Sequence, residues 1–231
     1  MHILDGIKRA LIIEPHADDL VIGCGGVIQF LVEREIEIFS ILLSPSPKIY
    51  EKIKNDAMSY VEYSWEDRFK ELKRAMDILG FSDVDIPFLD NAESVHHKLD
   101  TIPQYELIKI LEEKVKRCSP DLVFIPEKSY NQDHRTINDA FMTVVRPHFY
   151  NGTVLAYETT MEMDFEPNCL VPLSDKQFKK KIDACKCYET QLGCSRHLFS
   201  LETMEISMRY RGRLVFSDYG EAFRVVRLVL K

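Results

Sequence analysis

The 231-residue chain has no apolar run near the roughly 20 residues that a membrane-spanning helix needs. Its first nine residues contain no apolar segment of signal-peptide length. Tracts rich in glycine, serine or proline, low-complexity runs and internal repeats are also missing. Since nothing resembles an anchor, a leader or a linker, we expect a soluble, cytoplasmic protein whose residues 1–231 form one domain.

Basic residues are scarcer than acidic ones, with 30 lysines and arginines against 37 aspartates and glutamates, for a formal charge of −7. An acidic surface disfavours general binding to nucleic acid. The six cysteines of a cytoplasmic protein should be reduced thiols. The spacing of Cys185, Cys187 and Cys194 matches no common zinc pattern, so we expect free thiols on a helix there.

Apolar, strand-like segments alternate with segments of helical spacing along the whole chain. The predicted strands cover residues 10–13, 35–43, 84–89, 122–126, 154–157 and 224–230. The predicted helices cover residues 24–34, 65–79, 103–118, 135–145 and 176–192, and a loop is expected over 44–54. This alternation predicts an α/β fold, a Rossmann-like sandwich in which helices cover both faces of a mostly parallel sheet.

Two polar clusters each follow a predicted strand and precede a helix. The first contains His16, Asp18 and Asp19, and the second is the run Tyr-Asn-Gln-Asp-His at 130–134. In open α/β sheets, ligands bind beyond the carboxyl ends of the strands, so the two clusters can meet at one crevice. Either cluster alone could simply start a helix, because aspartate is a common N-cap residue.

His16, Asp19 and His134 would supply two nitrogens and one carboxylate oxygen, the ligand set of a catalytic zinc site with an open position for water. The same set accepts Fe²⁺, Co²⁺ or Mn²⁺. Asp18 would remain as a general base for a water whose pKa the metal lowers to about 7. Asp133 could orient a ligand imidazole or a neighbouring donor.

Glycines follow the first cluster in the pattern Gly23-x-Gly25-Gly26. They predict a tight turn into the next helix, whose backbone N–H groups could face an anion. The spacing differs from those of dinucleotide-binding and P-loop motifs.

These residues resemble the PIG-L/LmbE family of zinc-dependent N-acetylsugar deacetylases. Pro-His-Ala-Asp-Asp with the following Gly-Gly pair resembles the family's PHPDD signature, and Asp133-His134 matches the end of its HxDH signature. Weaker similarities are Arg68-x-x-Glu71, the Glu-Thr-Gln run at 189–191 and Tyr-Gly-Glu-Ala-Phe at 219–223. Together the similarities extend from residue 10 to residue 224.

The resemblance implies that His16, Asp19 and His134 bind zinc and that Asp18 activates the metal-bound water. The implied reaction removes an N-acetyl group from a sugar or sugar conjugate of the N-acetylglucosamine type, giving a free amine and acetate. The resemblance also implies an arginine near the sugar, at Arg68.

Two positions depart from the family pattern. Ala17 replaces the proline of PHPDD, and Asn131 replaces the first histidine of HxDH. Asn131 can donate a hydrogen bond to an oxyanion but cannot supply a proton at neutral pH. Asp18 could return the proton that it takes, and Tyr130 is a second candidate oxyanion donor.

Substrate contacts are predicted at Arg68, Asp90 and Arg211, each with a structural alternative. Arg68 could be a solvated helix residue, and Asp90 a turn residue. Arg211 alternates with Arg209 and Arg213 in a segment expected to be extended, where one face would suit an anionic group or would be a solvated edge. His96 and His97 are expected to face solvent or to belong to a lid.

Three functional interpretations therefore stay open. The main hypothesis is a zinc-dependent N-deacetylase acting on a small N-acetylated sugar. The first alternative, raised by Asn131, is a catalytically impaired relative that binds a sugar or nucleotide. The second is a zinc amidase for a non-sugar amide. The sequence does not decide between a monomer and a homo-oligomer.

Overall fold

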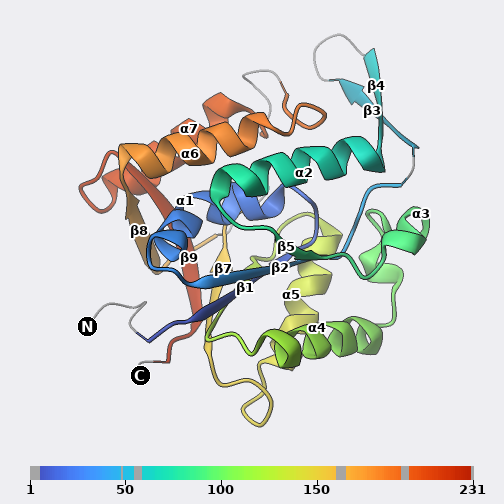
Figure 1. Cartoon of the computed structure of the whole chain (residues 1–231), viewed down its shortest axis with the longest axis horizontal. Coiled ribbons are helices and arrows are strands. Elements are labelled where there is room, and N and C mark those ends of the chain that lie inside the picture. Colours follow the sequence, from blue (N-terminus) through green and yellow to red (C-terminus); the bar gives the residue numbers. More distant parts are fainter. Residues whose placement is uncertain (1–5, 48, 55–58, 160–164, 194–197, 230–231) are drawn as a thin grey trace.

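The structure is a computed structural model that describes residues 6–47, 49–54, 59–159, 165–193 and 198–229. Its centre is a seven-stranded sheet in the order β5-β2-β1-β6-β7-β9-β8 (Figure 1). The strands are β1 (Arg9–Glu14), β2 (Glu37–Leu42), β5 (Asp83–Asp85), β6 (Leu122–Pro126), β7 (Thr153–Tyr157), β8 (Cys169–Leu173) and β9 (Tyr219–Arg227). β5, β2, β1, β6 and β7 pair in parallel, whereas β9 is antiparallel to both neighbours.

Helices cover both faces of this sheet, which confirms the predicted α/β sandwich. One apolar core takes residues from α1 (Asp19–Glu33), α2 (Trp65–Leu79), α6 (Asp175–Lys186) and α7 (Leu201–Arg213). The other takes residues from α4 (Gln104–Cys118) and α5 (Gln132–Val144). Ala10 and Ile12 of β1 belong to the first core, and Leu11 and Ile13 to the second, because successive side chains of a strand point to opposite faces.

Short elements complete the chain. β3 (Ile49–Lys54) and β4 (Ser59–Ser64) form an antiparallel hairpin beside the main sheet. Between β5 and α4 lie two 3₁₀ turns, Leu89–Asn91 and Leu99–Thr101, with α3 (Ala92–Val95) between them. The predicted loop at 44–54 is therefore wrong over 49–54, where backbone pairing with β4 makes a strand.

The order of the strands places the two polar clusters together. β1 lies between β2 and β6, so the chain leaves β1 toward one side of the sheet and later returns to its other side. The carboxyl ends of β1 and β6 consequently meet at a switch point, where ligands of such sheets bind. The first cluster follows β1, and the second follows β6.

The glycines at 23–26 lie inside α1 and do not form the predicted turn. A Cβ on Gly25 would lie 2.9 Å from Cγ of Lys181, and one on Gly26 would lie 2.4 Å from Cδ1 of Leu173. The Glu221 carboxylate accepts hydrogen bonds of 2.7 Å from the backbone N–H groups of both Gly26 and Val27. The anion facing these N–H groups is therefore a side chain of the protein itself.

Lys181 completes this contact with α1. Its Nζ donates to Oε1 of Glu221 at 2.6 Å and to the carbonyl of Ile22 at 2.5 Å. Both charged residues are 3% exposed. A buried ion pair thus joins α6 and β9 to the backbone of α1, and Gly25 and Gly26 leave the space that it needs.

The segment that carries Arg209, Arg211 and Arg213 is helical, so the prediction of an extended segment is wrong. Ser200 caps α7 by accepting a hydrogen bond from the backbone N–H of Thr203. Met204, Met208 and Gly212 recur every four residues and are buried, which is the period of a helix face. The alternating arginines suggest a strand, but the four-residue spacing of the buried side chains determines that the segment is a helix.

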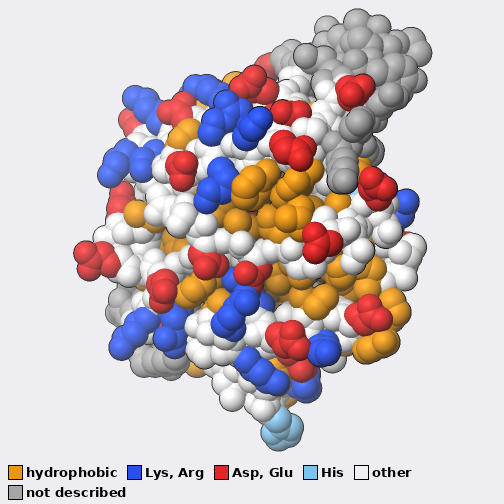
Figure 2. All heavy atoms as spheres, turned by 45° about the vertical axis from the view of Figure 1, so that its right-hand side comes forward, with side chains coloured by type: hydrophobic (Ala, Val, Ile, Leu, Met, Phe, Trp, Pro, Cys, Tyr) orange, Lys and Arg blue, Asp and Glu red, His pale blue; other side chains and the backbone are white. Residues whose placement is uncertain are grey.

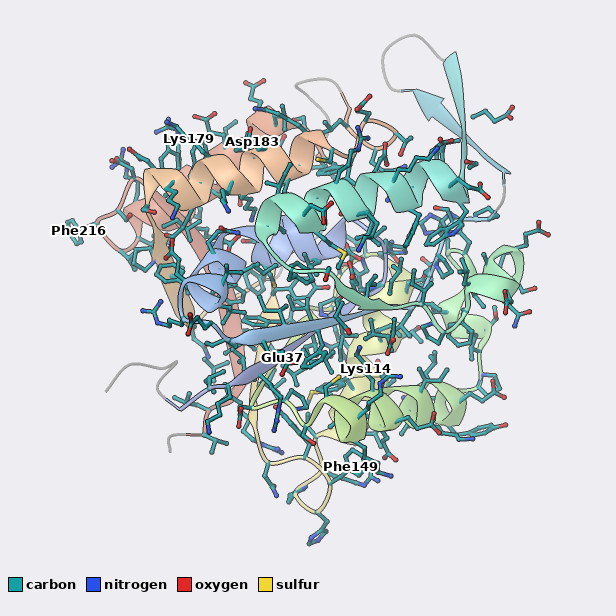
Figure 3. The ribbon with its side chains drawn as sticks, viewed as in Figure 1. Glu37, Lys114, Phe149, Lys179, Asp183 and Phe216 are labelled. Atoms are coloured by element: carbon teal, nitrogen blue, oxygen red, sulfur yellow. The ribbon has the colours of Figure 1, made fainter. Side chains whose placement is uncertain are left out.

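The polar surface mixes charges of both signs. Figure 2 shows basic and acidic side chains interspersed around a central band of apolar side chains on the face in view. In Figure 3, Lys114 of α4 points toward the sheet, where its Nζ lies 3.1 Å from Asp83 and 3.0 Å from Asp85. The described helices are all too short or too polar to span a bilayer.

Candidate metal centre

Three side chains from the two clusters converge on one another. Nδ1 of His16 lies 3.1 Å from Oδ2 of Asp19, and Nε2 of His134 lies 3.2 Å from the same oxygen. The two imidazole nitrogens are 3.3 Å apart. His16 follows β1, Asp19 begins α1 and His134 lies in the first turn of α5. The fold therefore brings residues 16, 19 and 134 to one point, as the sequence predicts.

This triangle has the dimensions of a metal site. An ion placed roughly 2.1 Å from all three atoms would subtend angles of about 100° between them, which suits a four-coordinate site with an open position. Two imidazoles and a carboxylate are ligands of intermediate softness that accept zinc and other divalent transition metals. The donor set and its spacing thus fit a catalytic divalent ion.

In the triangle, contacts between oppositely charged groups outweigh the effect of burial on the pKa values of Asp19 and His16. Burial would raise the pKa of Asp19, but the His134 and His16 imidazoles outweigh burial and lower it. Burial would lower the pKa of His16, but its hydrogen bonds to Asp133 and Asp19 raise it to about 10. Without a metal, His16 is therefore held as an imidazolium between two carboxylates at neutral pH.

Asp133 orients His16, the type of role that the sequence predicts for it. Its Oδ2 lies 3.1 Å from Nε2 of His16, on the ring edge opposite Asp19. Its Oδ1 accepts a hydrogen bond of 2.9 Å from the backbone N–H of Leu99. Because Nε2 faces this buried carboxylate, Nδ1 is the nitrogen directed to the triangle.

Two hydroxyls hold the other imidazole, and no sequence motif indicates either of them. Nδ1 of His134 lies 2.9 Å from Oγ of Ser129 and 3.2 Å from Oγ1 of Thr159. Either hydroxyl can accept the Nδ1 proton, which leaves the Nε2 lone pair for the triangle. Thr159 follows β7, so only the folded sheet could reveal this contact.

Glu14 at the end of β1 was also missed. Its side chain is fully buried, and this burial, reinforced by the charge of Asp19, raises the pKa of Glu14 well above its usual value. The neutral form of Glu14 is therefore favoured more strongly than that of an exposed glutamate.

Asp18 and Arg68 form the neighbouring wall. Oδ2 of Asp18 lies 3.7 Å from Nη2 of Arg68, and the Arg68 guanidinium also donates to Glu71 at 2.9 Å and Thr190 at 3.3 Å. Burial would lower the pKa of Arg68, but Asp18 and Glu71 outweigh it, so the guanidinium stays charged. Arg68 is only 4% exposed, which excludes the alternative of a solvated helix residue.

A cavity of about 200 Å³ opens beside the triangle. Its wall includes His16, Asp18, Asp19, Arg68, Asn131 and His134 among the residues singled out from the sequence. Further described wall residues are Ser44, Ser46, Tyr63, His96, His97, Gln191 and Phe199. His96 and His97 thus belong to the cavity wall, where His96 is half-buried and His97 is exposed, as predicted for a residue that faces solvent.

Four predicted site residues do not line this cavity, namely Asp133, which bonds to His16, and the three that follow. Tyr130 is 62% exposed and does not line the cavity, where an oxyanion donor is needed. Asp90 is exposed in the 3₁₀ turn after β5. Arg211 lies on α7, where its guanidinium bonds to both carboxylate oxygens of Glu158 at 3.0 and 2.6 Å. Asp90 and Arg211 thus do not line this cavity, and Arg211 instead lines a neighbouring cavity of about 30 Å³ together with Ile22 and Thr159.

The thiols behave as expected where the structure describes them. Cys185 is buried on α6, and Cys187 is half-buried at its end. Burial raises the pKa of Cys185 to about 12. Cys194 lies outside the described residues.

The profile of the PIG-L family, described as GlcNAc-PI de-N-acetylase, matches residues 11–145, which include both clusters. The chain belongs to the PIG-L family. It is 24% identical over 213 residues to the probable N-acetyl-alpha-D-glucosaminyl L-malate deacetylase 2 of Bacillus anthracis, covering 88% of this chain and 87% of the relative. It is also 24% identical over 243 residues to the diacetylchitobiose deacetylase of Thermococcus kodakarensis, covering 95% and 84%.

Solved structures share the fold of this PIG-L family member. The conserved protein TT1542 of Thermus thermophilus superimposes with a TM-score of 0.75 at 22% identity, covering 97% of both chains. The 4-carboxy-2-hydroxymuconate hydratase of Pseudomonas putida also superimposes, with a TM-score of 0.66 at 18% identity and coverage of 97% and 98%. Since a hydratase has the same fold, the fold alone does not define the reaction, which must be argued from the site.

Proposed function

We propose that the protein is a metal-dependent deacetylase that removes the N-acetyl group from a sugar or sugar conjugate. The observation that supports this most is the triangle of Nδ1 of His16, Oδ2 of Asp19 and Nε2 of His134, with edges of 3.1 to 3.3 Å, beside a carboxylate that lies outside it. Membership of the PIG-L family supports the same chemistry. The two curated relatives, both named as deacetylases of N-acetylated sugars, support the substrate class.

Zinc is the proposed ion, and its ligands are His16, Asp19 and His134. A bound divalent ion lowers the pKa of a coordinated water to about 7 and polarises a carbonyl oxygen. Asp133 keeps His16 in the orientation that such an ion requires, and Ser129 and Thr159 do the same for His134.

Asp18 is the proposed general base. Its carboxylate lines the cavity and is outside the triangle, so it can accept a proton from the attacking water. The same carboxyl group can then deliver that proton to the amine nitrogen when the carbon–nitrogen bond breaks. Arg68, 3.7 Å away, holds the Asp18 side chain on this wall.

Asn131 is proposed to act chiefly by capping α5, through a hydrogen bond from the backbone of Asp133 to its side chain. Its Oδ1 accepts a hydrogen bond of 2.9 Å from the N–H of Asp133 and caps α5. This cap orients the turn that carries Asp133 and His134. Its amide N–H₂ group remains a candidate donor toward substrate, because the residue lines the cavity.

The proposal extends to the whole chain. β1 and β9 come from opposite ends of the sequence and belong to one sheet, which supports a single deacetylase domain over residues 1–231. A cytoplasmic location and assembly into a homo-oligomer stay predictions.

Acetate release measures this function directly. The purified, zinc-loaded protein should release acetate from N-acetylglucosamine, its malate glycoside or diacetylchitobiose. Asp18→Asn should lower kcat by at least about 10²-fold while zinc stays bound, because it removes a base and no ligand. Wild-type protein that holds zinc and releases acetate from none of these sugars would overturn the proposal.

Because the amide of Asn131 cannot transfer a proton at neutral pH, a second candidate is a sugar- or nucleotide-binding relative without turnover. Such a protein would bind an acetylated glycoside with the same Kd with and without zinc. A panel of non-sugar N-acetyl amides separates the remaining candidate, a general zinc amidase. The amidase would hydrolyse the panel as fast as the sugars, whereas the proposed deacetylase would prefer the sugars.

A further inference from the structure

His97 is a residue of the cavity wall to which the proposed reaction has so far assigned no role. Its ring centroid lies 4.8 Å from that of His16. One of its ring nitrogens lies within 4.8 Å of both a His16 ring nitrogen and an Asp133 carboxylate oxygen. The imidazole therefore stands beside His16 and Asp133, in the wall of the cavity that Asn131 also lines.

The backbone of His97 is held tightly in an unusual conformation. Its φ is 54°, in the left-handed region that non-glycine residues rarely adopt. Its N–H donates to Oγ of Ser44 at 3.0 Å, and its carbonyl accepts from Nε2 of Gln132 at 2.8 Å. Such conformations cost free energy and cluster at functional sites, where surrounding contacts maintain them.

The same contacts tie His97 to the metal-binding residues. Gln132 and Asp133 are both in the first turn of α5, two residues and one residue before His134, respectively. The Asp133 carboxylate bonds to His16 through Oδ2 and to the N–H of Leu99 through Oδ1. The Asp133 carboxylate thus holds the predicted metal ligand His16. It also holds the segment that carries His97, through the backbone of Leu99 two residues further on.

Acyl transfer needs a donor for the oxygen that becomes negatively charged. Several described residues of the cavity wall carry donors, among them Ser46, Tyr63, His96 and Gln191. The reason to single out His97 is that its ring centroid lies 4.8 Å from that of the predicted metal ligand His16. Arg68 already bonds to Glu71 and Thr190 and pairs with Asp18, and Asp18 as a carboxylate only accepts. Asn131 uses its Oδ1 to cap α5, which constrains the direction of its amide. An imidazole carries at least one N–H donor whether it is neutral or charged, so this role does not depend on its protonation.

We propose that His97 is a catalytic residue whose ring N–H donates a hydrogen bond to the acyl oxygen of the bound amide as negative charge develops on it. This inference rests on the proposed deacetylase function and deepens it. The bond strengthens in the transition state, so His97 contributes to kcat more than to substrate binding.

Four variants test this role by acetate release, each with its zinc content and unfolding midpoint measured. His97→Met removes every side-chain donor at similar length, whereas His97→Gln and His97→Asn place an amide N–H₂ near the positions of Nε2 and Nδ1. His148→Met is the matched control, since His148 is exposed and lies outside the cavity wall.

We expect His97→Met to lower kcat by about 10²-fold or more, the usual effect of removing one oxyanion donor, with KM changed less than about threefold. One of the two amide variants should recover at least about tenfold, and the one that does so identifies the donating nitrogen. His148→Met should match wild type.

Two results would overturn the proposal while leaving the deacetylase function intact. In the first, wild type is active and His97→Met keeps kcat within about twofold. In the second, the Met, Gln and Asn variants are equally impaired with full zinc content, which indicates a role of shape alone. A wild-type protein that holds zinc and releases no acetate overturns the deacetylase function, and this role with it.

Discussion

The buried ion pair between Lys181 and Glu221 should be among the most sensitive points of the fold. Glu221 accepts three hydrogen bonds of 2.6 to 2.7 Å, one from Lys181 and two from the backbone of α1. Glu221→Gln keeps the size of the side chain but loses the charge. The amide also has only one acceptor oxygen, so its N–H₂ group must face another donor.

The cost follows from the burial of the pair. Lys181 is 3% exposed, so Glu221→Gln leaves an ammonium group in the interior without its counter-charge. Breaking a buried ion pair from one side costs about 3–5 kcal/mol of unfolding free energy. The double variant with Lys181→Met removes the unpaired charge, and we expect it to cost less than the sum of the single variants.

Urea unfolding followed by circular dichroism measures these free energies. Asp183→Asn is the control on the same helix, because Asp183 points away from the body in Figure 3 and pairs with Lys186 at the surface, where both side chains are more than half exposed. It should change the free energy by less than about 1 kcal/mol. A loss below about 1 kcal/mol in Glu221→Gln, or strict additivity in the double variant, would refute the reasoning.

Three further predictions concern the metal centre and α1, the helix that begins at Asp19. Because the pKa of His16 is raised to about 10 in the metal-free protein, its Nδ1 proton must leave when zinc binds. Calorimetry at pH 7.5 in buffers of different ionisation enthalpy should therefore find that about one proton is released per zinc bound. The apparent affinity for zinc should rise with pH up to about pH 10. No proton release would contradict this charge state. Asp133→Asn should weaken zinc binding about 10–100-fold in a chelator competition, since it weakens the hold on Nε2 of His16, and an unchanged Kd would count against that role. Gly26→Ala should cost about 1–3 kcal/mol in urea unfolding, because its Cβ would lie 2.4 Å from Leu173, and a variant as stable as wild type would show that the space can adapt.

Much of the architecture could be predicted from local patterns. The helix 65–79 and the strand 122–126 have the predicted bounds, because each combines a clear apolar period with a definite stop. Gly80 adopts the left-handed conformation expected at the end of the helix, with φ of 94°. The strand at 169–173 was missed, and its burial pattern shows why: only Leu173 is fully buried, so it lacks the continuous apolar run of the central strands.

The triangle itself could be predicted because topology, and not detailed packing, brings His16, Asp19 and His134 together. Neighbouring parallel strands must end at one edge of the sheet. His97 and Thr159 belong to segments whose course depends on tertiary contacts. The hydrogen bonds that fix them, to Ser44, Gln132 and His134, have no local sequence pattern.

The central claim is that His16, Asp19 and His134 hold one divalent ion. Metal analysis of the zinc-loaded, dialysed protein tests it most directly when wild type is compared with Asp18→Asn and His134→Ala. We predict about one zinc per chain in wild type and in Asp18→Asn, and almost none in His134→Ala. Equal zinc in wild type and His134→Ala, or none in any of the three, would contradict the claim.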